Sequence, residues 1–317
     1  VMLKGKTVIL GITGSIAAYK MANVASMLKK LHCNVEVIMT KNAVNFINPI
    51  TFETLTGNKC LIDTFDRNFQ FQVEHISLAK RADLLMVAPA SANIIGKLAN
   101  GIADDMLTTT ALACTCQKII APAINTNMYL NPIVQDNMKR LQNYGFEMVE
   151  AASGHLACGD SGIGKLPEEK LLVEHIVRSI AREKDMKGMK VLVSAGATME
   201  AIDPVRYITN HSTGKMGFAL AKAAMLRGAS VTVVKGQPEA EEPHFVKMVP
   251  VKSAQQMFEA VKEEAADADI VIMAAAVADY RPSEVYDQKV KKSDGEMSIA
   301  LTRTPVSYTH LRAHETD

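Results

Sequence analysis

Residues Ile119 to Tyr129 read IIAPAINTNMY, a short apolar run followed by a loop rich in amide side chains. The apolar run predicts a buried strand, which breaks at Pro122. Asn125 and Asn127 then place uncharged donors and acceptors at the carboxyl end of that strand, where open α/β sheets bind their ligands. Asn and Pro also form ordinary turns after strands, so the pattern favours a parallel α/β sheet and leaves the function of the loop open.

Apolar runs and amphipathic segments alternate on both sides of this stretch. Strands are predicted over residues 7–12, 35–39, 84–88, 118–121 and 146–149, and helices over residues 16–31, 92–100, 104–116, 132–144 and 167–181. A partly polar helical region is expected over residues 41–61. This alternation predicts a flavodoxin-like or Rossmann-like α/β fold, with a doubly wound parallel sheet.

Small polar residues follow several of these strands. Gly14 and Ser15 lie in a glycine turn before a helix, which suits a phosphate, although a plain turn explains the same residues. Thr40 and Ser91 either contact a ligand or cap the next helix, and Asn93 follows Ser91 closely. We expect these residues to meet at the carboxyl edge of the sheet.

Two more reactive side chains lie outside the strand ends. His75 is predicted to lie in a turn, and no second His stands at metal-ligand spacing, so a metal site is not expected. Cys158 lies in GHLACGDSGIG, residues 154–164, whose glycine content suits a mobile flap. An inert surface loop is the alternative for this segment.

A second α/β unit is predicted after a charged linker at residues 182–190, since 317 residues are long for a single domain. Its strands are expected over residues 191–195, 231–234, 245–249 and 270–275, and its helices over residues 215–226 and 254–266. Lys289 begins a lysine cluster that suits a triphosphate or forms a solvated face.

Composition narrows the class of protein. Hydrophobic residues make up 48% of the chain, charged residues 22%, and the net charge is +1, which argues against a nucleic-acid partner. Five cysteines without a CxxC pair argue against disulfides and structural zinc and predict a cytoplasmic protein. No segment reaches the ~18 unbroken apolar residues of a membrane span.

Several motifs together resemble the bifunctional flavoproteins phosphopantothenoylcysteine decarboxylase / phosphopantothenate–cysteine ligase of coenzyme A biosynthesis. The first half carries GSIAAYK (14–20), the His75 loop, APASAN (88–93), PAINTNM (122–128) and ACGD (157–160). The second half carries DPVRYITNHSTGKMG (203–217) and AAAVADY (274–280). The resemblance covers nearly the whole chain and implies a decarboxylase domain at residues 1–181 and a ligase domain at residues 191–305.

For the first domain, the resemblance implies bound FMN and decarboxylation of 4′-phosphopantothenoylcysteine to 4′-phosphopantetheine. His75 would act as the base in thiol oxidation, Asn125 would hold the substrate carboxylate, and Cys158 would donate the final proton. The residues expected to hold the flavin are Gly14, Ser15, Thr40, Ser91 and Asn93. In this family the flavin sites lie between subunits, so a homo-oligomer is expected.

For the second domain, the resemblance implies that 4′-phosphopantothenate reacts with CTP, brought with Mg²⁺, and that cysteine then displaces CMP. Asn210 would steady the acyl-cytidylate intermediate, and Arg206 and Lys289 would neutralise phosphate charge. Ala275 and Asp279 would line the nucleotide pocket. No protein-bound metal site, no nucleic acid and no membrane are expected.

The chain departs from the family pattern after Pro305, where VSYTHLRAHETD (306–317) is polar and has the character of a non-native tail. We therefore expect an incomplete, Rossmann-like ligase domain that does not ligate. Two other functions are weighed against this one: a monofunctional decarboxylase of peptidyl cysteines and a non-catalytic regulatory flavoprotein. The ligase motifs disfavour the first, and the presence of His75, Asn125 and Cys158 disfavours the second.

Overall fold

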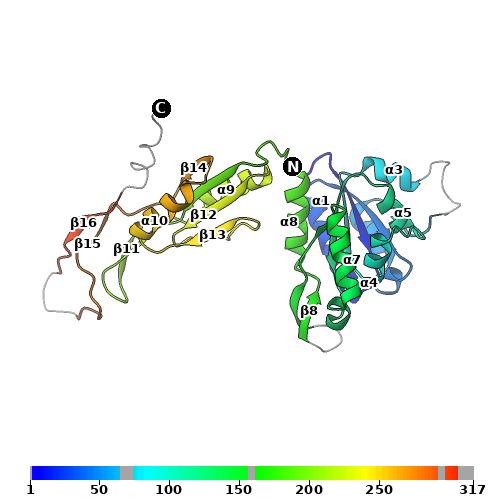
Figure 1. Cartoon of the computed structure of the whole chain (residues 1–317), viewed down its shortest axis with the longest axis horizontal. Coiled ribbons are helices and arrows are strands. Elements are labelled where there is room, and N and C mark those ends of the chain that lie inside the picture. Colours follow the sequence, from blue (N-terminus) through cyan, green and yellow to red (C-terminus); the bar gives the residue numbers. More distant parts are fainter. Residues whose placement is uncertain (1, 65–73, 156–160, 292–296, 306–317) are drawn as a thin grey trace. The chain divides into compact units, whose positions relative to one another are not determined.

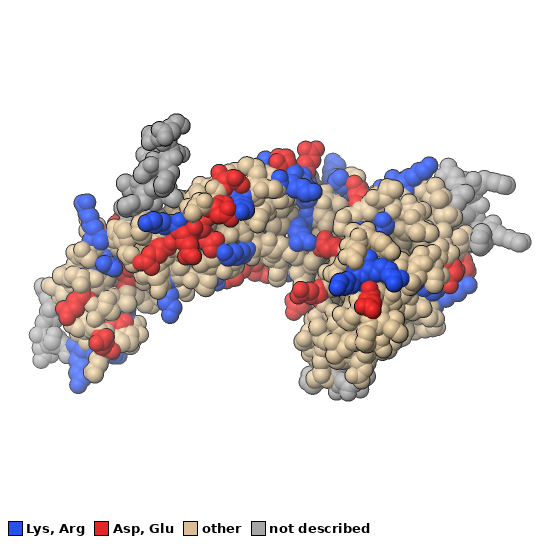
Figure 2. All heavy atoms as spheres, in the orientation of Figure 1, with Lys and Arg blue, Asp and Glu red and all other residues tan. Residues whose placement is uncertain are grey.

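The computed structural model describes residues 2–64, 74–155, 161–291 and 297–305. The chain folds into two compact units, residues 1–181 and 182–317, and each is an α/β structure around its own parallel sheet (Figure 1). Both positive and negative side chains lie on the visible surface (Figure 2), and the net charge of the chain is +1.

The first unit is built on a six-stranded parallel sheet with the order β3-β2-β1-β4-β5-β6. Its strands are Thr7–Ile12 (β1), Asn34–Met39 (β2), Cys60–Leu61 (β3), Leu84–Ala90 (β4), Gln117–Pro122 (β5) and Glu147–Met148 (β6). The strand order reverses between β1 and β4, which creates a crevice at their carboxyl ends. This order confirms the predicted doubly wound fold.

Helices cover both faces of this sheet (Figure 1). The set α1, α2 and α8 packs together, and α3, α4, α5 and α7 form a second packed set. Helix α1 buries Met21, Val24, Ala25 and Leu28, whose spacing makes the apolar stripe of an amphipathic helix. The helices are Ile16–Tyr19 (η1, 3₁₀), Lys20–Lys30 (α1), Ala43–Asn45 (η2, 3₁₀), Pro49–Thr56 (α2), Glu74–Arg81 (α3), Ala92–Ala99 (α4), Met106–Ala113 (α5), Thr126–Tyr129 (α6), Pro132–Asn143 (α7) and Glu169–Ile180 (α8).

An antiparallel hairpin, Ala152–His155 (β7) and Ser161–Lys165 (β8), stands where a glycine-rich flap was predicted. Strand β8 lies against the loop after β5, since Ile124 N donates to Gly164 O over 2.9 Å and Thr126 Oγ1 donates to Ile163 O over 2.9 Å. The described part of the predicted flap is therefore a docked hairpin.

The second unit has a four-stranded parallel sheet with the order β13-β12-β9-β14. Its strands are Lys190–Ala195 (β9), Ser230–Lys235 (β12), Lys247–Pro250 (β13) and Ile270–Met273 (β14), and its helices are Lys215–Leu226 (α9) and Ala254–Ala265 (α10). Two antiparallel pairs complete it: Met199–Ala201 (β10) with Tyr207–Thr209 (β11), and Tyr280–Pro282 (β15) with Leu301–Arg303 (β16).

Three local predictions were wrong. The helix expected over residues 16–31 starts as a 3₁₀ turn, which Ser15 caps, and becomes α-helical only at Lys20. The region 41–61 contains the short strand β3, which two residues of apolar sequence could not signal. His75 lies in the first turn of helix α3 and not in a turn between elements.

The segment expected to be a linker is largely packed against the second unit. Met186 N donates to Arg227 O over 3.0 Å, Lys184 Nζ donates to Leu226 O over 2.6 Å, and Asp185 pairs with the Arg227 side chain. Residues 184–186 are thus held at the carboxyl end of α9.

In the described part of the chain, no helix combines the length and the apolar character needed to cross a membrane.

Candidate active sites

The carboxyl ends of β1 and β4 are joined by one buried hydroxyl, that of Thr13. Its Oγ1 donates to Pro89 O over 2.6 Å and accepts from Ser91 N over 3.0 Å, and Thr13 is only 1% exposed. A buried side chain with both of its bonding directions used is rigid. Thr13 therefore fixes the spacing of the two turns that flank the switch point.

The turn after β1 lies against the loop after β2. A Cβ at Gly14 would come within 2.8 Å of Asn42 Cβ, so this close approach requires glycine. Ser15 caps the first 3₁₀ turn, with its Oγ accepting from Ala17 N over 3.3 Å, and Thr40 N donates to Ile12 O over 3.0 Å. The structure thus brings Gly14, Ser15 and Thr40 together.

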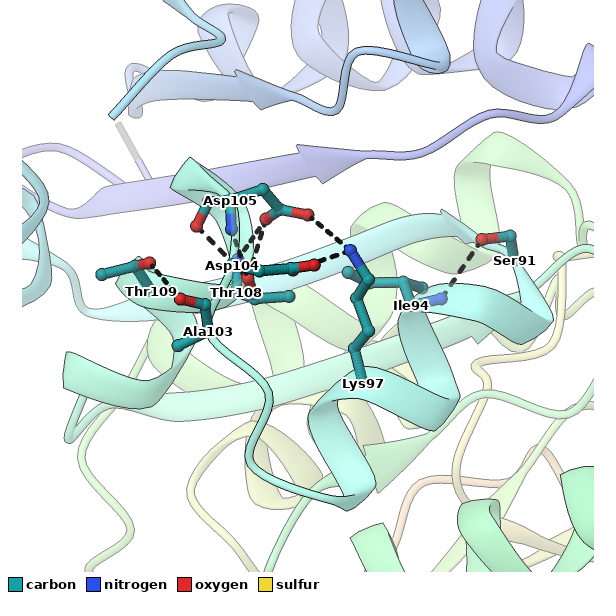
Figure 3. A network of polar contacts seen from close by, with 8 residues as sticks. All are labelled: Ser91, Ile94, Lys97, Ala103, Asp104, Asp105, Thr108 and Thr109. Carbon is teal, nitrogen blue, oxygen red and sulfur yellow. Dashed lines mark hydrogen bonds and ion pairs between the residues drawn. The ribbon is translucent and has the colours of Figure 1, made fainter. Parts of the chain in front are cut away.

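Helix α4, which follows β4, is fixed at both ends (Figure 3). Ser91 Oγ accepts from Ile94 N over 3.4 Å at the start of the helix. Lys97 Nζ lies 2.7 Å from Asp104 Oδ1 and 3.4 Å from an oxygen of Asp105, the N-cap of α5. The bond to Asp104 raises the pKa of Lys97. The first turn of α4, which carries the exposed Asn93, is therefore held in place.

Asn125 lies at the same edge of the sheet. Ala123 N donates to Ala90 O over 3.0 Å, which ties the loop after β5 to the end of β4. Asn125 caps the short helix α6, and its Oδ1 accepts from Asn127 N over 3.0 Å. Because the side-chain carbonyl serves the cap, the side-chain Nδ2 is the group that can donate to an anion.

His75 and Cys158 are placed differently. His75 is half-buried in the first turn of α3, which packs against α5. Within the described residues, no hydrogen bond or ion pair joins His75 to the strand-end loops just described. Cys158 lies outside the described residues.

The donors at this edge suit an anionic, flat ligand. The strand-end segments 13–15, 40–42, 88–93 and 123–127 contain hydroxyls and amides but no carboxylate. A set of donors without carboxylates, in which Lys41 is the only charged side chain, fits a phosphate and a heterocycle, the two parts of a flavin nucleotide. The residues expected to hold FMN therefore match its chemistry.

In the second unit, two buried hydroxyls join β9 to the loop after β14. Ser194 Oγ accepts from Ala274 N over 3.1 Å and from Ala275 N over 3.2 Å. Thr198 Oγ1 accepts from Ala278 N over 3.0 Å, and both hydroxyl residues are fully buried. The loop that carries Ala275 is therefore fixed from the first strand of the sheet, as in the first unit.

Asn210 lies beside that loop and lines a cavity of about 780 Å³. Its Nδ2 donates to Val277 O over 3.1 Å. Helix α9 begins at this cavity with Gly214 as its N-cap at φ +74°, and residues 211–217 form part of the wall. Unpaired N–H groups at a helix start favour an anion, so the cavity is suited to a phosphate-bearing ligand.

The Arg206 side chain is bound by other groups of the same chain. Its Nη2 lies 2.5 Å from Asp203 Oδ2 and donates to Val290 O over 3.1 Å. Asp203 is buried and also accepts from Val290 N over 3.1 Å. The Arg206 bonds hold the pKa of this carboxyl well below its usual range. This cluster anchors the segment that carries Lys289, which is exposed.

Arg206 lines a neighbouring cavity of about 610 Å³. Among the described residues, the predicted nucleotide-binding residues Arg206, Ala275, Asp279 and Lys289 do not line the Asn210 cavity, although Ala274 beside Ala275 does. Asp279 is exposed, and its carbonyl accepts from Thr304 N over 3.0 Å. No group of three or more His, Cys, Asp or Glu side chains in the described ranges is arranged to hold a metal ion.

Both units match families of known proteins. The family model "Flavoprotein" matches residues 1–181, and the model "DNA/pantothenate metabolism flavoprotein C-terminal domain" matches residues 186–316. The coenzyme A biosynthesis bifunctional protein CoaBC of Bacillus subtilis (strain 168) is 46% identical over 306 residues, which cover 96% of this chain and 75% of that protein.

The chain belongs to the CoaBC family.

Two other CoaBC proteins match over similar lengths. The Haemophilus influenzae protein is 42% identical, over 98% of this chain and 79% of its own length, and the Borreliella burgdorferi protein is 40% identical, over 98% and 80%. A solved structure, that of the FMN-dependent cysteine decarboxylase SpaF, is 29% identical with a TM-score of 0.49 and covers 56% of this chain and 97% of that chain.

Three structural residues of this CoaBC chain were missed from sequence: Thr13, Ser194 and Thr198. Each is a hydroxyl residue at or just after the carboxyl end of the first strand of its sheet. The sequence signal is a hydroxyl residue within three positions of a glycine at the end of an apolar strand. What the sequence did not show is the partner, which lies more than 70 residues away in each case.

Proposed function

We propose that the chain catalyses two steps of coenzyme A biosynthesis, CTP-dependent ligation of 4′-phosphopantothenate with cysteine and FMN-dependent decarboxylation of the product. This proposal replaces the expectation that the second unit does not ligate, because the C-terminal family model matches residues 186–316. The observation that carries this proposal is the match of CoaBC proteins across both units. The family models support the division, with the flavoprotein activity in residues 1–181 and the ligase activity in the second unit. A monofunctional peptidyl-cysteine decarboxylase would not need the second unit.

The first unit would hold FMN at the carboxyl edge through Gly14, Ser15, Thr40, Ser91 and Asn93. A flavin held by these residues would supply the two-electron oxidation of the thiol-bearing carbon of the substrate, and that oxidation would provide an acceptor for the electrons of the breaking C–CO₂ bond. Asn125 Nδ2 would donate to the substrate carboxylate and orient it. The docked hairpin β7–β8 would limit the access of water to that side of the loop.

His75 would take the thiol proton during oxidation, and Cys158 would return a proton to the product. Because the resemblance places the flavin sites between subunits, we propose that a second copy of the chain supplies His75 to the Asn125 loop. The homo-oligomer expected from the resemblance then becomes a requirement of the active site.

The second unit would bind CTP against the start of α9 and the loop 274–278. Asn210, held at Val277, would face the acyl-cytidylate formed in the cavity. Lys289 would contribute its charge from the segment that Asp203 anchors. Arg206 would act mainly by holding Asp203, so its contribution to phosphate binding would be indirect. Magnesium would arrive bound to the triphosphate.

The decarboxylase assignment is tested by the absorption spectrum of the purified protein and by release of carbon dioxide from 4′-phosphopantothenoylcysteine. We expect noncovalent FMN close to one per chain. His75→Asn should keep the flavin and lose turnover. Asn125→Asp should also keep the flavin, because a carboxylate oxygen can still cap α6, but its negative charge should repel the substrate carboxylate. A colourless protein, or full turnover by either variant, would remove the assignment.

The ligase assignment is tested separately by CMP release from CTP, magnesium, 4′-phosphopantothenate and cysteine. Asn210→Asp should lower CMP release at least about tenfold, because a carboxylate cannot donate to Val277 O and repels the cytidylate phosphate. Unchanged release by this variant would exclude Asn210 from the site. The expectation that residues 306–317 are non-native falls outside the described residues and stays a prediction.

A further inference from the structure

A cavity of about 550 Å³ lies at the amino edge of the first sheet. Lys118, the second residue of β5, is on its wall, whereas the residues proposed to hold the flavin follow the carboxyl ends of the strands. The remaining wall comes from α5 and from the carboxyl ends of α4 and α7. The cavity is therefore separate from both proposed active sites, and a test of it does not depend on either proposed activity.

Helices α4 and α7 end at this cavity in the same way. In each case a glycine with a positive φ, +69° or +85°, follows the C-cap residue. Ile102 N donates to Lys97 O over 3.0 Å, and Phe146 N donates to Leu141 O over 3.0 Å. These bonds are those of a Schellman turn, in which backbone N–H groups satisfy the last carbonyls of a helix. The two helix ends therefore need no side-chain cation to cap them.

Two cationic side chains nevertheless line the cavity, those of Lys118 and Arg140, and none of its described lining residues carries a carboxylate. Lys118 Nζ lies 5.4 Å from the centre of the Phe146 ring, and Arg140 Nη1 donates to Asn100 Oδ1 over 2.8 Å. Neither cation forms an ion pair with an Asp or Glu in the described part of the chain. Two positive charges on one cavity without a counter-charge favour an anionic ligand.

Most of the other lining side chains are apolar. Ile102, Leu112 and Tyr144 are 48%, 66% and 67% exposed, and the half-buried Leu98 and Phe146 continue the apolar lining toward the core. Covering such side chains gains about 25 cal/mol for each Å² of apolar surface removed from water. The cavity therefore offers an apolar surface beside two cations.

We propose that this cavity is a binding site for a small amphipathic carboxylate, with the carboxylate at Lys118 and Arg140 and the apolar body against Ile102, Leu112 and Tyr144. A guanidinium can bind both oxygens of one carboxylate, and the ammonium of Lys118 adds a second positive charge. The volume is within the range of about 300–1,000 Å³ that is usual for small-molecule sites.

The first experiment uses 3-phenylpropionate as the probe and follows its binding to the folded full chain by ligand-observed NMR titration. We expect a dissociation constant of about 1 mM or tighter, as for a small ligand of modest efficiency. The neutral 3-phenylpropanamide should bind about fivefold more weakly, because it lacks the charge. Acetate, which lacks the apolar body, should not compete at the same concentration. Equal affinities for the acid and the amide, or full competition by acetate, would overturn the proposal.

The second experiment locates the site. Lys118→Gln and Arg140→Gln should each weaken binding of 3-phenylpropionate about fivefold, and Leu112→Asn should weaken it by removing apolar contact. Lys139→Gln is the matched control, because Lys139 is the exposed neighbour of Arg140 on α7 and is not among the lining residues. Affinity that is unchanged in both cation variants, or that falls equally in the control, would contradict the assignment.

A second copy of the chain is the rival occupant of the exposed apolar side chains. Size-exclusion chromatography with light scattering distinguishes the two occupants. We expect the same mass for the wild type, for Leu112→Asn and for the wild type with saturating 3-phenylpropionate. A smaller mass in the variant, or on addition of the probe, would show that the cavity is an interface between copies and would overturn the proposal.

Discussion

At the scale of single residues, one buried hydroxyl spans the switch point of the first sheet. Thr13 accepts a hydrogen bond from Ser91 N and donates one to Pro89 O. In the second unit, Ser194 accepts hydrogen bonds from two backbone N–H groups of the loop after β14. Both residues act on the backbone of loops that carry proposed ligand contacts. Their effect on ligand binding should therefore be separable from their effect on folding.

Thr13→Val keeps the shape of the side chain but leaves Ser91 N without its acceptor. We expect a stability loss of about 1–3 kcal/mol, the cost of an unsatisfied buried donor, and weaker flavin binding. Thr13→Ser keeps the hydroxyl and should restore flavin affinity. Urea unfolding and flavin titration measure the two effects, and equal flavin affinity in the Val and Ser variants would contradict a positioning role.

Asp203 couples the stability of the second unit to pH. Its folded pKa lies below the ordinary value of 3.8, chiefly because of the Arg206 bonds. A lowered pKa means that the contribution is complete well above pH 3.8 and is lost as the pH falls toward the folded pKa. Asp203→Asn should therefore be less stable than the wild type at pH 7, and the difference should shrink below about pH 4. Urea unfolding of both proteins at a series of pH values tests this, and a constant difference would contradict it.

At the scale of elements, the hairpin β7–β8 depends on glycine for its contact with the Asn125 loop. A Cβ at Gly164 would overlap the carbonyl oxygen of Ile124, and Gly164 has φ +128°. Gly162 is similarly close to Thr126. The approach of β8 to this loop therefore requires backbone without side chains.

Gly164→Ala should displace the hairpin and lower decarboxylation about tenfold or more, while the flavin stays bound through the other loops. Gly145→Ala is the matched control, because Gly145 also has a positive φ, +85°, but open space around its Cβ position. The control should lose only the ~1 kcal/mol of a strained backbone. Carbon dioxide release and thermal unfolding compare the two, and equal activities would show that the contact is not needed.

At the scale of the whole molecule, the proposed decarboxylase site takes His75 from one chain and Asn125 from another. Co-expression of His75→Asn with Asn125→Asp should then give mixed oligomers in which some sites carry both native residues. With random mixing about a quarter of the wild-type activity should return. Each variant expressed alone serves as the control, and mixed oligomers without activity would show that both residues act within one chain.

The sequence by itself determined the fold class and most of the elements. Strands β1, β2, β4 and β9 were predicted within two residues, because continuous apolar runs bounded by turn residues identify buried parallel strands. The same strand ends indicated where Gly14, Ser91 and Asn125 would meet, since parallel strands share a carboxyl edge. The proposed roles of His75, Cys158 and Asn210 came only from the resemblance to the family motifs.

Only the tertiary structure decided what these residues contact. Thr13 and Ser194 find partners more than 70 positions away, and Arg206 binds a buried carboxylate and is not left free for a ligand. The strand β3 and the docked hairpin β7–β8 also depend on neighbours, because short or glycine-rich segments form strands only when another strand or loop completes their hydrogen bonds. Local sequence carries periodicity and turn chemistry, whereas long-range pairing exists only once the sheet has assembled.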